Sequence, residues 1–308
     1  MKVDRAIALY LRHLEVLHRS PRTIEAEEER LRRLVAYLAE MEIEDVEALG
    51  RDVVQDYPEA LATSVTARGE PLRVTTQTNR LIAARNLLRW LHRRDYVAVD
   101  LSGSIELPRE VHPLPKEVIE PAEMRRLLAL PDVTTALGSR DRAMLEVLYS
   151  TGIRVSELIA LAVEDLDLDG GYVRVRCGKG ARDRVVPIGR VAAQVVRAYL
   201  HEARSSLVRD GAQRRVFVSA TGRTLTRQRV ATRVRQYVTR AGISKRITPH
   251  CFRVTCATGM LRNGARLRHL QEMLGHRSVD TLEPYLRLTI PELKEMHARY
   301  HPREQLGP

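Results

Sequence analysis

The feature that most limits the fold of this chain is a proline-rich stretch about one third of the way along it. Residues 107–121, LPREVHPLPKEVIEP, contain four prolines: Pro108, Pro113, Pro115 and Pro121. Proline lacks the backbone donor that a helix interior or a central strand requires, so neither element is expected to run through this stretch. A chain of 308 residues can hold two domains with separate cores. We therefore expect a domain at 1–107, a linker at 108–116 and a second domain at 117–308.

Hydrophobic periodicity predicts helices on both sides of the linker. Apolar residues recur at helical spacing in 20–41, which opens with Ser20 and Pro21, and again in 75–97. The second domain also begins with helices. Residues 169–188 then change to an alternating pattern around the turn at 178–180, which indicates a β-hairpin, and helices follow it. The fold class predicted is mostly α with a small antiparallel sheet.

Positive charge is concentrated in the second domain. Residues 1–110 contain 17 Lys and Arg against 19 Asp and Glu, whereas 111–308 contain 34 against 20, and the whole chain carries a net charge of +12. Such an excess favours a polyanionic partner such as nucleic acid, although an arginine-rich genome could also raise the count. Aromatic residues make up only 4% of the chain, which argues against stacking on unpaired bases. Duplex DNA held through its backbone is the better match.

Cysteine content and hydropathy bear on the compartment. The three cysteines, Cys177, Cys251 and Cys256, are too few and too odd in number for a disulfide framework, and we expect buried structural thiols rather than a metal site. No apolar run approaches the roughly 18 residues of a transmembrane helix, and the first 15 residues are too charged for a secretory signal. The expected location is the cytoplasm, in association with the nucleoid, with no membrane partner.

Several arginines are candidates for DNA contact. Arg85, Arg89 and Arg93 give the helix predicted at 75–97 a basic side, which either faces solvent or contacts phosphates. Arg182 and Arg184, just after the hairpin turn, are further candidates.

Two further candidate cations lie in the segment STGIRVSELIAL, residues 150–161, and at the hairpin tip. Gly152 is expected to end one helix and Ser156 to begin the next, which leaves Arg154 in the turn with Glu157 placed to hold its guanidinium. An ordinary surface ion pair is the alternative. Lys179 lies between glycines at the hairpin tip, where it could donate a proton to a leaving oxygen or simply face solvent. The P-loop pattern is not present around it.

The last motifs lie in ITPHCFRVTCATGMLRNG, residues 247–264, and LGHRSVDTLEPYLRL, residues 274–288. His250 and Arg253 are expected on one face of the first turn of a helix that starts after Thr248, where the free amides favour phosphate. His276 follows a helix-ending glycine. Tyr285, nine residues later, follows Pro284, so the chain must fold back if the histidine and the tyrosine are to meet.

Together these candidates are two arginines, two histidines, one lysine and one tyrosine. Phosphoryl transfer needs cations around the transition state, an acid for the leaving group and a nucleophile in line. A tyrosine nucleophile implies a covalent phosphotyrosine intermediate. No acidic cluster in the sequence suggests a magnesium site, so the arginines are expected to take the place of a metal, and no cofactor is expected.

These motifs resemble the tyrosine recombinase, or phage integrase, family, and within it the Xer-type and integron-type integrases. The resemblance rests on TGIRVSELIAL, GKGARDRVVPI, HCFR, LGHRSVDTLEPY and the tail LKEMHARYHP, in this order behind a helical domain and a linker. It implies an N-terminal core-binding domain of the SAM-like type and a C-terminal catalytic domain, which together form a C-shaped clamp around DNA.

The resemblance also implies a role for each candidate. Tyr285 would be the nucleophile that forms a 3′-phosphotyrosine, and Lys179 would protonate the 5′-hydroxyl leaving group. The scissile phosphate would be bound by the remaining catalytic residues, with Glu157 in support: Arg154, His250, Arg253 and His276. The family works as a homotetramer that exchanges strands through a Holliday junction, and some members need a second recombinase or an accessory protein. The segment 291–300 has the apolar spacing of a C-terminal exchange helix, but it could also pack on its own domain.

Three positions depart from the family pattern. Val254 and Gly259 stand where histidines are common, and Pro284 directly before the tyrosine is unusual. We expect Tyr285 to lie on a mobile segment.

The two alternative functions are a type IB topoisomerase-like activity without synapsis, and a DNA-binding protein that has lost catalysis. The biological task could be chromosome-dimer resolution, integration of a mobile element or plasmid resolution.

Overall fold

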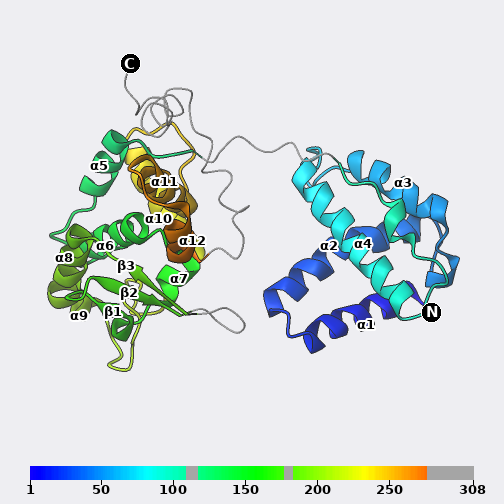
Figure 1. Cartoon of the computed structure of the whole chain (residues 1–308), viewed down its shortest axis with the longest axis horizontal. Helices are drawn as coiled ribbons and strands as arrows, with labels where there is room; N and C mark the ends of the chain where they lie inside the picture. The colour runs from blue at the N-terminus through cyan, green and yellow to red at the C-terminus, as the bar shows by residue number, and fades with distance from the viewer. Residues whose placement is uncertain (109–116, 177–182, 276–308) are drawn as a thin grey trace, which may run out of the picture. The chain divides into compact units, whose positions relative to one another are not determined.

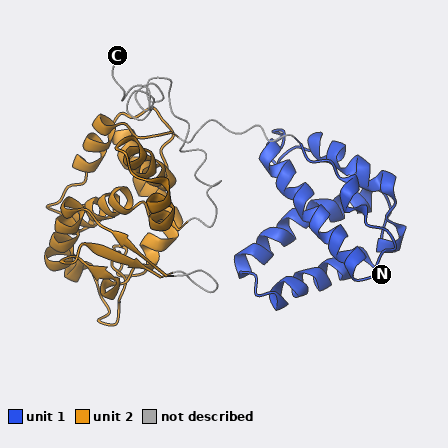
Figure 2. Ribbon diagram, in the orientation of Figure 1, with its two compact units in different colours: residues 1–112 blue, residues 113–308 orange. Residues whose placement is uncertain are grey.

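The computed structural model of the chain describes residues 1–108, 117–176 and 183–275. It contains two compact units, Met1–His112 and Pro113–Pro308 (Figure 2). Each unit has a hydrophobic core of its own. No helix among the described residues is long and apolar enough to cross a membrane.

Unit 1 is helical, with four α-helices and two short 3-10 turns between 1 and 108 (Figure 1). The helices are α1 (Val3–Val16), α2 (Pro21–Glu40), α3 (Arg51–Ala62) and α4 (Val74–Arg93). Two of them confirm the helices predicted at 20–41 and 75–97, although α4 ends four residues earlier than expected. The Ser20 hydroxyl accepts a hydrogen bond from the Thr23 amide at 3.1 Å, and Pro21 occupies the first helical position, so α2 begins where its sequence predicts.

The core of unit 1 forms around α4. Its inward face is apolar and buried, and it packs against α1, α2, α3 and the 3-10 turn at 101–104. Leu81, Ala84 and Leu91 are fully buried on that face. The charged residues of α4 therefore lie on its other side, as an amphipathic helix requires.

Unit 2 has eight described α-helices and a small sheet. The helices are α5 (Pro121–Ala129), α6 (Ala136–Thr151), α7 (Val155–Ala160), α8 (Arg190–Ala198), α9 (Arg204–Leu207), α10 (Arg227–Arg240), α11 (Pro249–Arg262) and α12 (Leu267–Leu274). A π-helical turn at Tyr199–Ala203 joins α8 to α9. The strands are β1 (Leu166–Asp167), β2 (Tyr172–Val175) and β3 (Arg184–Pro187).

The three described strands form an antiparallel sheet in the order β1-β2-β3. In β2 and β3, Val173 pairs with Val186 and Val175 pairs with Arg184. The three valines are buried, whereas Val185 is 56% exposed, so the period-2 alternation places one face of the hairpin against the core. The predicted hairpin is confirmed. Cys177 and the turn at 178–180 lie outside the described residues.

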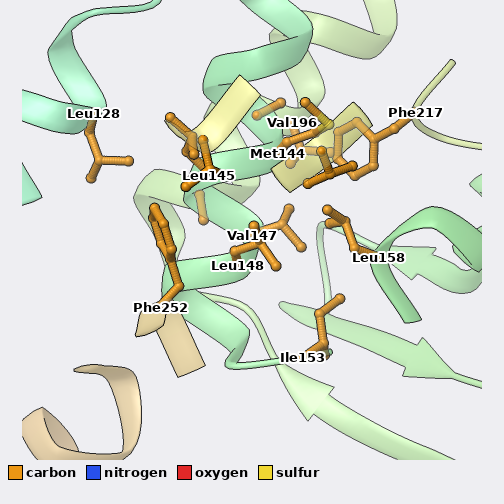
Figure 3. Close-up of a cluster of buried hydrophobic side chains, with 14 of the residues drawn as sticks. Leu128, Met144, Leu145, Val147, Leu148, Ile153, Leu158, Val196, Phe217 and Phe252 are labelled. Atoms are coloured by element: carbon orange, nitrogen blue, oxygen red, sulfur yellow. The ribbon is translucent and has the colours of Figure 1, made fainter. Parts of the chain in front are cut away.

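Helix α6 crosses the middle of unit 2 and its side chains fill the core. Met144, Leu145 and Leu148 lie among apolar side chains that come from α5, α7, α8, α11 and the segment before α10 (Figure 3). Cys251 and Cys256 on α11 are also buried, at 3% and 6% exposure, as expected for structural thiols. The structure therefore confirms a mostly helical fold with a small antiparallel sheet.

Candidate active site

The turn between α6 and α7 places Arg154 at the start of a helix. Gly152 ends α6 in the left-handed conformation, with φ +60°, and its amide donates to the Leu148 carbonyl at 3.1 Å. Its backbone packs closely, because a Cβ added there would lie 2.9 Å from Cδ2 of Leu274 on α12. Arg154 is the N-cap of α7, one residue before the helix start rather than two as predicted from Ser156.

Glu157 holds Arg154 at two points. Its Oε1 accepts from the Arg154 guanidinium at 3.0 Å, and its Oε2 accepts from the Arg154 backbone amide at 2.8 Å. The contact predicted between these two residues is therefore present. The Arg154 side chain is 45% exposed and that of Glu157 only 11%, so the arginine reaches solvent while its carboxylate partner is enclosed.

Arg184 of β3 is a second partner of the same carboxylate. Its Nη1 and Nη2 donate to the two oxygens of Glu157 at 3.0 and 2.8 Å, and its Nε donates to the Met273 carbonyl of α12 at 3.0 Å. Burial alone would raise the pKa of Glu157. Hydrogen bonds from Arg184 and Arg154, together with the positive charge of Arg184, outweigh that effect and lower the pKa below its ordinary value.

Arg253 on α11 also contacts the α6–α7 turn and the end of α12. Its side chain is 1% exposed, and its Nη1 and Nη2 donate to the carbonyls of Gly152 and Leu274 at 2.9 and 2.8 Å. A buried guanidinium bound to two helix-terminal carbonyls fixes both helix ends in space. His250 lies one turn earlier at the exposed start of α11, which begins at Pro249 after Thr248 as predicted.

Helix α12 ends beside these arginines. Gly275 caps it in the left-handed conformation, with φ +67°, and the two carbonyls before this cap accept from Arg184 and Arg253. Leu270 and Leu274 of this helix are fully buried. His276 is the next residue in the sequence and lies outside the described residues, as do Lys179, Arg182, Tyr285 and the segment 291–300.

The structure thus brings four predicted residues into one region of unit 2. Glu157 contacts Arg154 directly, and Arg253 binds the carbonyl two residues before Arg154, while His250 lies three residues before Arg253 on α11. The exposed Arg154 guanidinium and the free amides at the N-terminus of α11 can donate to an oxyanion such as a phosphate, and the buried Arg253 adds positive charge to the same region. Among the described residues, no group of three His, Cys, Asp or Glu side chains could hold a metal ion.

The family departures that the structure describes are accommodated without strain. Val254 is 4% exposed and packs in the interior next to Arg253. Gly259 has open space around it, with no atom within 4 Å of an added Cβ. The structural setting of Pro284 lies outside the described residues.

In unit 1 the candidate arginines of α4 lie four residues apart on one side of the helix. Arg85 and Arg89 are partly buried and Arg93 is exposed. Residues at this spacing are neighbours on a helix surface, so they form a basic row. Their contact with DNA stays a prediction.

Arg184 lies inside this site, where its side chain is 10% exposed and its guanidinium binds Glu157 and Met273. Its contact with DNA stays a prediction. The signal for its enclosed position was present in the alternation of the strand. Arg184 shares the inner face of the hairpin with Val186, and an arginine on an inner face requires a carboxylate or carbonyl partner.

Comparison with known proteins identifies the family. A model of the phage integrase family matches residues 117–290, and the N-terminal SAM-like domain of phage integrases matches residues 7–95. The chain belongs to the phage integrase family. The integrase match covers every candidate catalytic residue from Arg154 to Tyr285, including those outside the described residues.

Relatives of this integrase-family chain extend over nearly its full length. It is 33% identical to tyrosine recombinase XerD of Staphylococcus haemolyticus over 302 residues, which are 98% of this chain and 100% of the relative. It is 38% identical to tyrosine recombinase XerD of Pseudomonas aeruginosa over 258 residues, 84% of each chain. Among solved structures, the Tn1549 transposon integrase in complex with a circular intermediate DNA has a TM-score of 0.75 at 18% identity, covering 97% of this chain and 99% of that one.

Proposed function

We propose that this chain is a site-specific DNA recombinase that cuts and rejoins duplex DNA through a 3′-phosphotyrosine intermediate and a Holliday junction. One observation carries the proposal: Arg253 of α11 binds the carbonyl of Gly152, two residues before Arg154, so both arginines lie in one region. Family membership supports the same activity. A phosphodiester placed there meets concentrated positive charge without a metal ion or a nucleotide.

The proposed chemistry uses six groups. The Tyr285 hydroxyl gives up its proton to a neighbouring base or to water as its oxygen attacks the scissile phosphorus. The bond to the 5′ oxygen breaks, and Lys179 gives that oxygen a proton. Negative charge that develops on the non-bridging oxygens is stabilised by the four remaining catalytic residues: Arg154, His250, Arg253 and His276. The phosphotyrosine keeps the energy of the broken bond, so a 5′-hydroxyl from another strand can attack it and restore a phosphodiester.

We also propose the partners and domain roles that this activity needs. Residues 1–107 would form the core-binding domain and residues 117–308 the catalytic domain, with 108–116 as the linker of a clamp around DNA. Arg85, Arg89, Arg93, Arg182 and Arg184 would contact the duplex. The active assembly would be a homotetramer on two recombination sites of a mobile element, chromosome or plasmid, with or without an accessory protein, or a tetramer shared with a second recombinase. It would work in the cytoplasm at the nucleoid.

The test is a covalent-adduct assay in EDTA. Nicked duplexes from the DNA that flanks the gene, together with a random library, are incubated with the wild-type protein, Tyr285→Phe and Tyr172→Phe, and SDS-resistant adducts are sequenced. We expect adducts with the wild-type protein and with Tyr172→Phe, whose tyrosine lies on β2, and none with Tyr285→Phe. Adducts that persist in Tyr285→Phe would refute the assigned nucleophile, and adducts that require a divalent metal would refute the metal-free mechanism.

Two rival functions give different results in related assays. A type IB topoisomerase-like enzyme would relax supercoiled plasmids that carry no recombination site and would form no synaptic tetramer on paired sites. A protein that only binds DNA would retain duplex affinity without any adduct. Recombinant product from a plasmid that carries two copies of the sequenced site excludes both rivals.

A further inference from the structure

The strongest unassigned feature of unit 2 is the ion-pair network around Arg184. This arginine comes from β3, its carboxylate partner Glu157 from α7, and its carbonyl partner Met273 from α12. Glu157 and Arg184 are separated by 27 residues in the sequence, and Arg184 and Met273 by 89. One side chain therefore connects three elements that are close in sequence to the proposed catalytic residues Lys179, Arg154 and His276.

Burying the charges of Arg184 and Glu157 costs free energy when the protein folds. The side chains of Arg184 and Glu157 are only 10% and 11% exposed, so both charges have lost most of their hydration. A buried ion pair recovers little net stability compared with apolar residues of similar volume. A role in organising charge at the neighbouring site explains its presence better than a role in stability.

The geometry divides the Glu157 carboxylate between two guanidiniums. Arg184 binds both carboxylate oxygens through Nη1 and Nη2, whereas the Arg154 guanidinium contacts only Oε1. This bidentate pair fixes the plane of the carboxylate and hence the direction of the more exposed Arg154 side chain.

Charge balance gives the network a second effect. Glu157 and Arg154 alone would form a neutral pair, and the carboxylate would cancel much of the attraction of Arg154 for a phosphate. With Arg184 included, the three groups carry a net charge of +1. Because Arg184 compensates Glu157 in an enclosed place where charges are weakly screened, Arg154 keeps its positive charge for an anion.

We propose that Arg184 is a positioning residue for DNA cleavage, which neutralises and orients Glu157 so that Arg154 can act on the scissile phosphate. Its bond to Met273 also fixes the end of α12, directly before the residues that lead to His276. This inference rests on the proposed function of the site. It assigns no contact between Arg184 and the DNA.

The experiment is a double-mutant cycle in the full-length protein. Arg184→Gln removes the compensating charge and leaves the Glu157 carboxylate to cancel Arg154, so single-turnover adduct formation on a nicked duplex should slow by about 10²-fold. Adding Glu157→Gln removes the excess negative charge, and the double variant should recover at least about tenfold. Arg184→Lys keeps the charge but loses the bidentate geometry, and its rate of adduct formation should lie between those of the wild type and Arg184→Gln.

A matched control separates positioning from loss of folding. Arg142 on α6 also binds a largely buried carboxylate, Glu146, and a main-chain carbonyl of another helix, that of Leu128. Arg142→Gln should lower the melting temperature as Arg184→Gln does, but should cleave within about twofold of the wild-type rate at temperatures where all variants are folded. Glu157→Gln should bring no recovery in the Arg142→Gln background.

The outcomes distinguish this inference from the proposed function. If the wild type forms adducts and Arg184→Gln forms them equally fast, or stays slow when Glu157→Gln is added, the inference is wrong and the recombinase assignment stands. If the wild type forms no adducts, the inference about Arg184 is tested by the affinity of each variant for a nicked duplex. Arg184→Gln should bind several-fold more weakly, with recovery in the double variant, and equal affinities of the wild type and Arg184→Gln would overturn the inference.

Discussion

At the scale of single residues, the enclosed carboxylate of Glu157 governs how the site responds to acid. Its pKa in the folded protein lies below the ordinary value of 4.5, since the hydrogen bonds from two arginines outweigh the effect of burial. A group of this kind stabilises the fold fully above its unfolded pKa and loses that contribution as the pH falls through its folded pKa.

We expect the stability difference between the wild type and Glu157→Gln to shrink as the pH falls below about 4.5. Each unit by which the folded pKa is lowered corresponds to about 1.4 kcal/mol in the free energy of unfolding. Urea titrations from pH 3.5 to 7, followed by circular dichroism, measure the difference. Glu164→Gln, which replaces an exposed carboxylate of the same unit, serves as the control. A difference that grows toward acid would contradict the lowered pKa.

At the scale of elements, the α6–α7 turn depends on a glycine for two separate reasons. Gly152 has a positive φ, and Leu274 of α12 lies where its side chain would be. Gly264, which follows α11, also has a positive φ, at +86°, but has open space around an added Cβ. The two positions therefore separate backbone strain from steric contact.

Gly264→Ala should lower the free energy of unfolding by about 1–2 kcal/mol, which is the cost of the left-handed conformation for a residue with a side chain. Gly152→Ala should cost more than this, because the added methyl group must also displace Leu274. It should in addition slow adduct formation, since the displaced helix end carries a carbonyl that Arg253 binds. Urea denaturation and the adduct assay test the two effects. Equal costs at both glycines would show that the contact with Leu274 is relieved elsewhere.

The elements themselves could largely be predicted from the sequence, because their signals are local. Ser20 with Pro21, and Thr248 with Pro249, mark helix starts through caps within one turn, and Gly152 and Gly275 mark helix ends through their backbone freedom. The α7 start was displaced by one residue, since Glu157 caps the helix through the Arg154 amide and Ser156 does not. The exact start of the helix depends on which of two neighbouring residues has a capping partner.

At the scale of the whole molecule, each unit has its own buried core. The apolar clusters of residues 3–105 and 119–252 contain no residue from the other unit. The contacts that complete the site were beyond prediction from local patterns. Arg253 binds Gly152, which is 101 residues away in the sequence, and Arg184 binds Met273, which is 89 residues away. Such pairings follow from tertiary packing alone.

Separate cores predict that fragments 1–112 and 113–308 each fold independently and unfold cooperatively. The second fragment holds the charge excess, with 34 basic against 20 acidic residues. We therefore expect it to contribute most of the salt dependence of nonspecific duplex binding, because that slope counts neutralised phosphates. Fluorescence anisotropy at several salt concentrations measures the slope for each fragment and for the full chain. A steeper slope for fragment 1–112 would mean that the first unit makes most of the nonspecific phosphate contacts instead.

The long-range bonds of Arg253 also bear on the synthesis of the protein. Its guanidinium joins the end of α6 to the end of α12, so the arrangement cannot form until residue 274 has left the ribosome. At roughly 5–20 residues per second, Arg154 is translated several seconds before that point, and the first unit is complete earlier still. A growing chain can therefore fold its first unit while the proposed cleavage site is still incomplete. If the chain cleaves DNA as proposed, its unfinished copies would be unable to do so until α12 is in place.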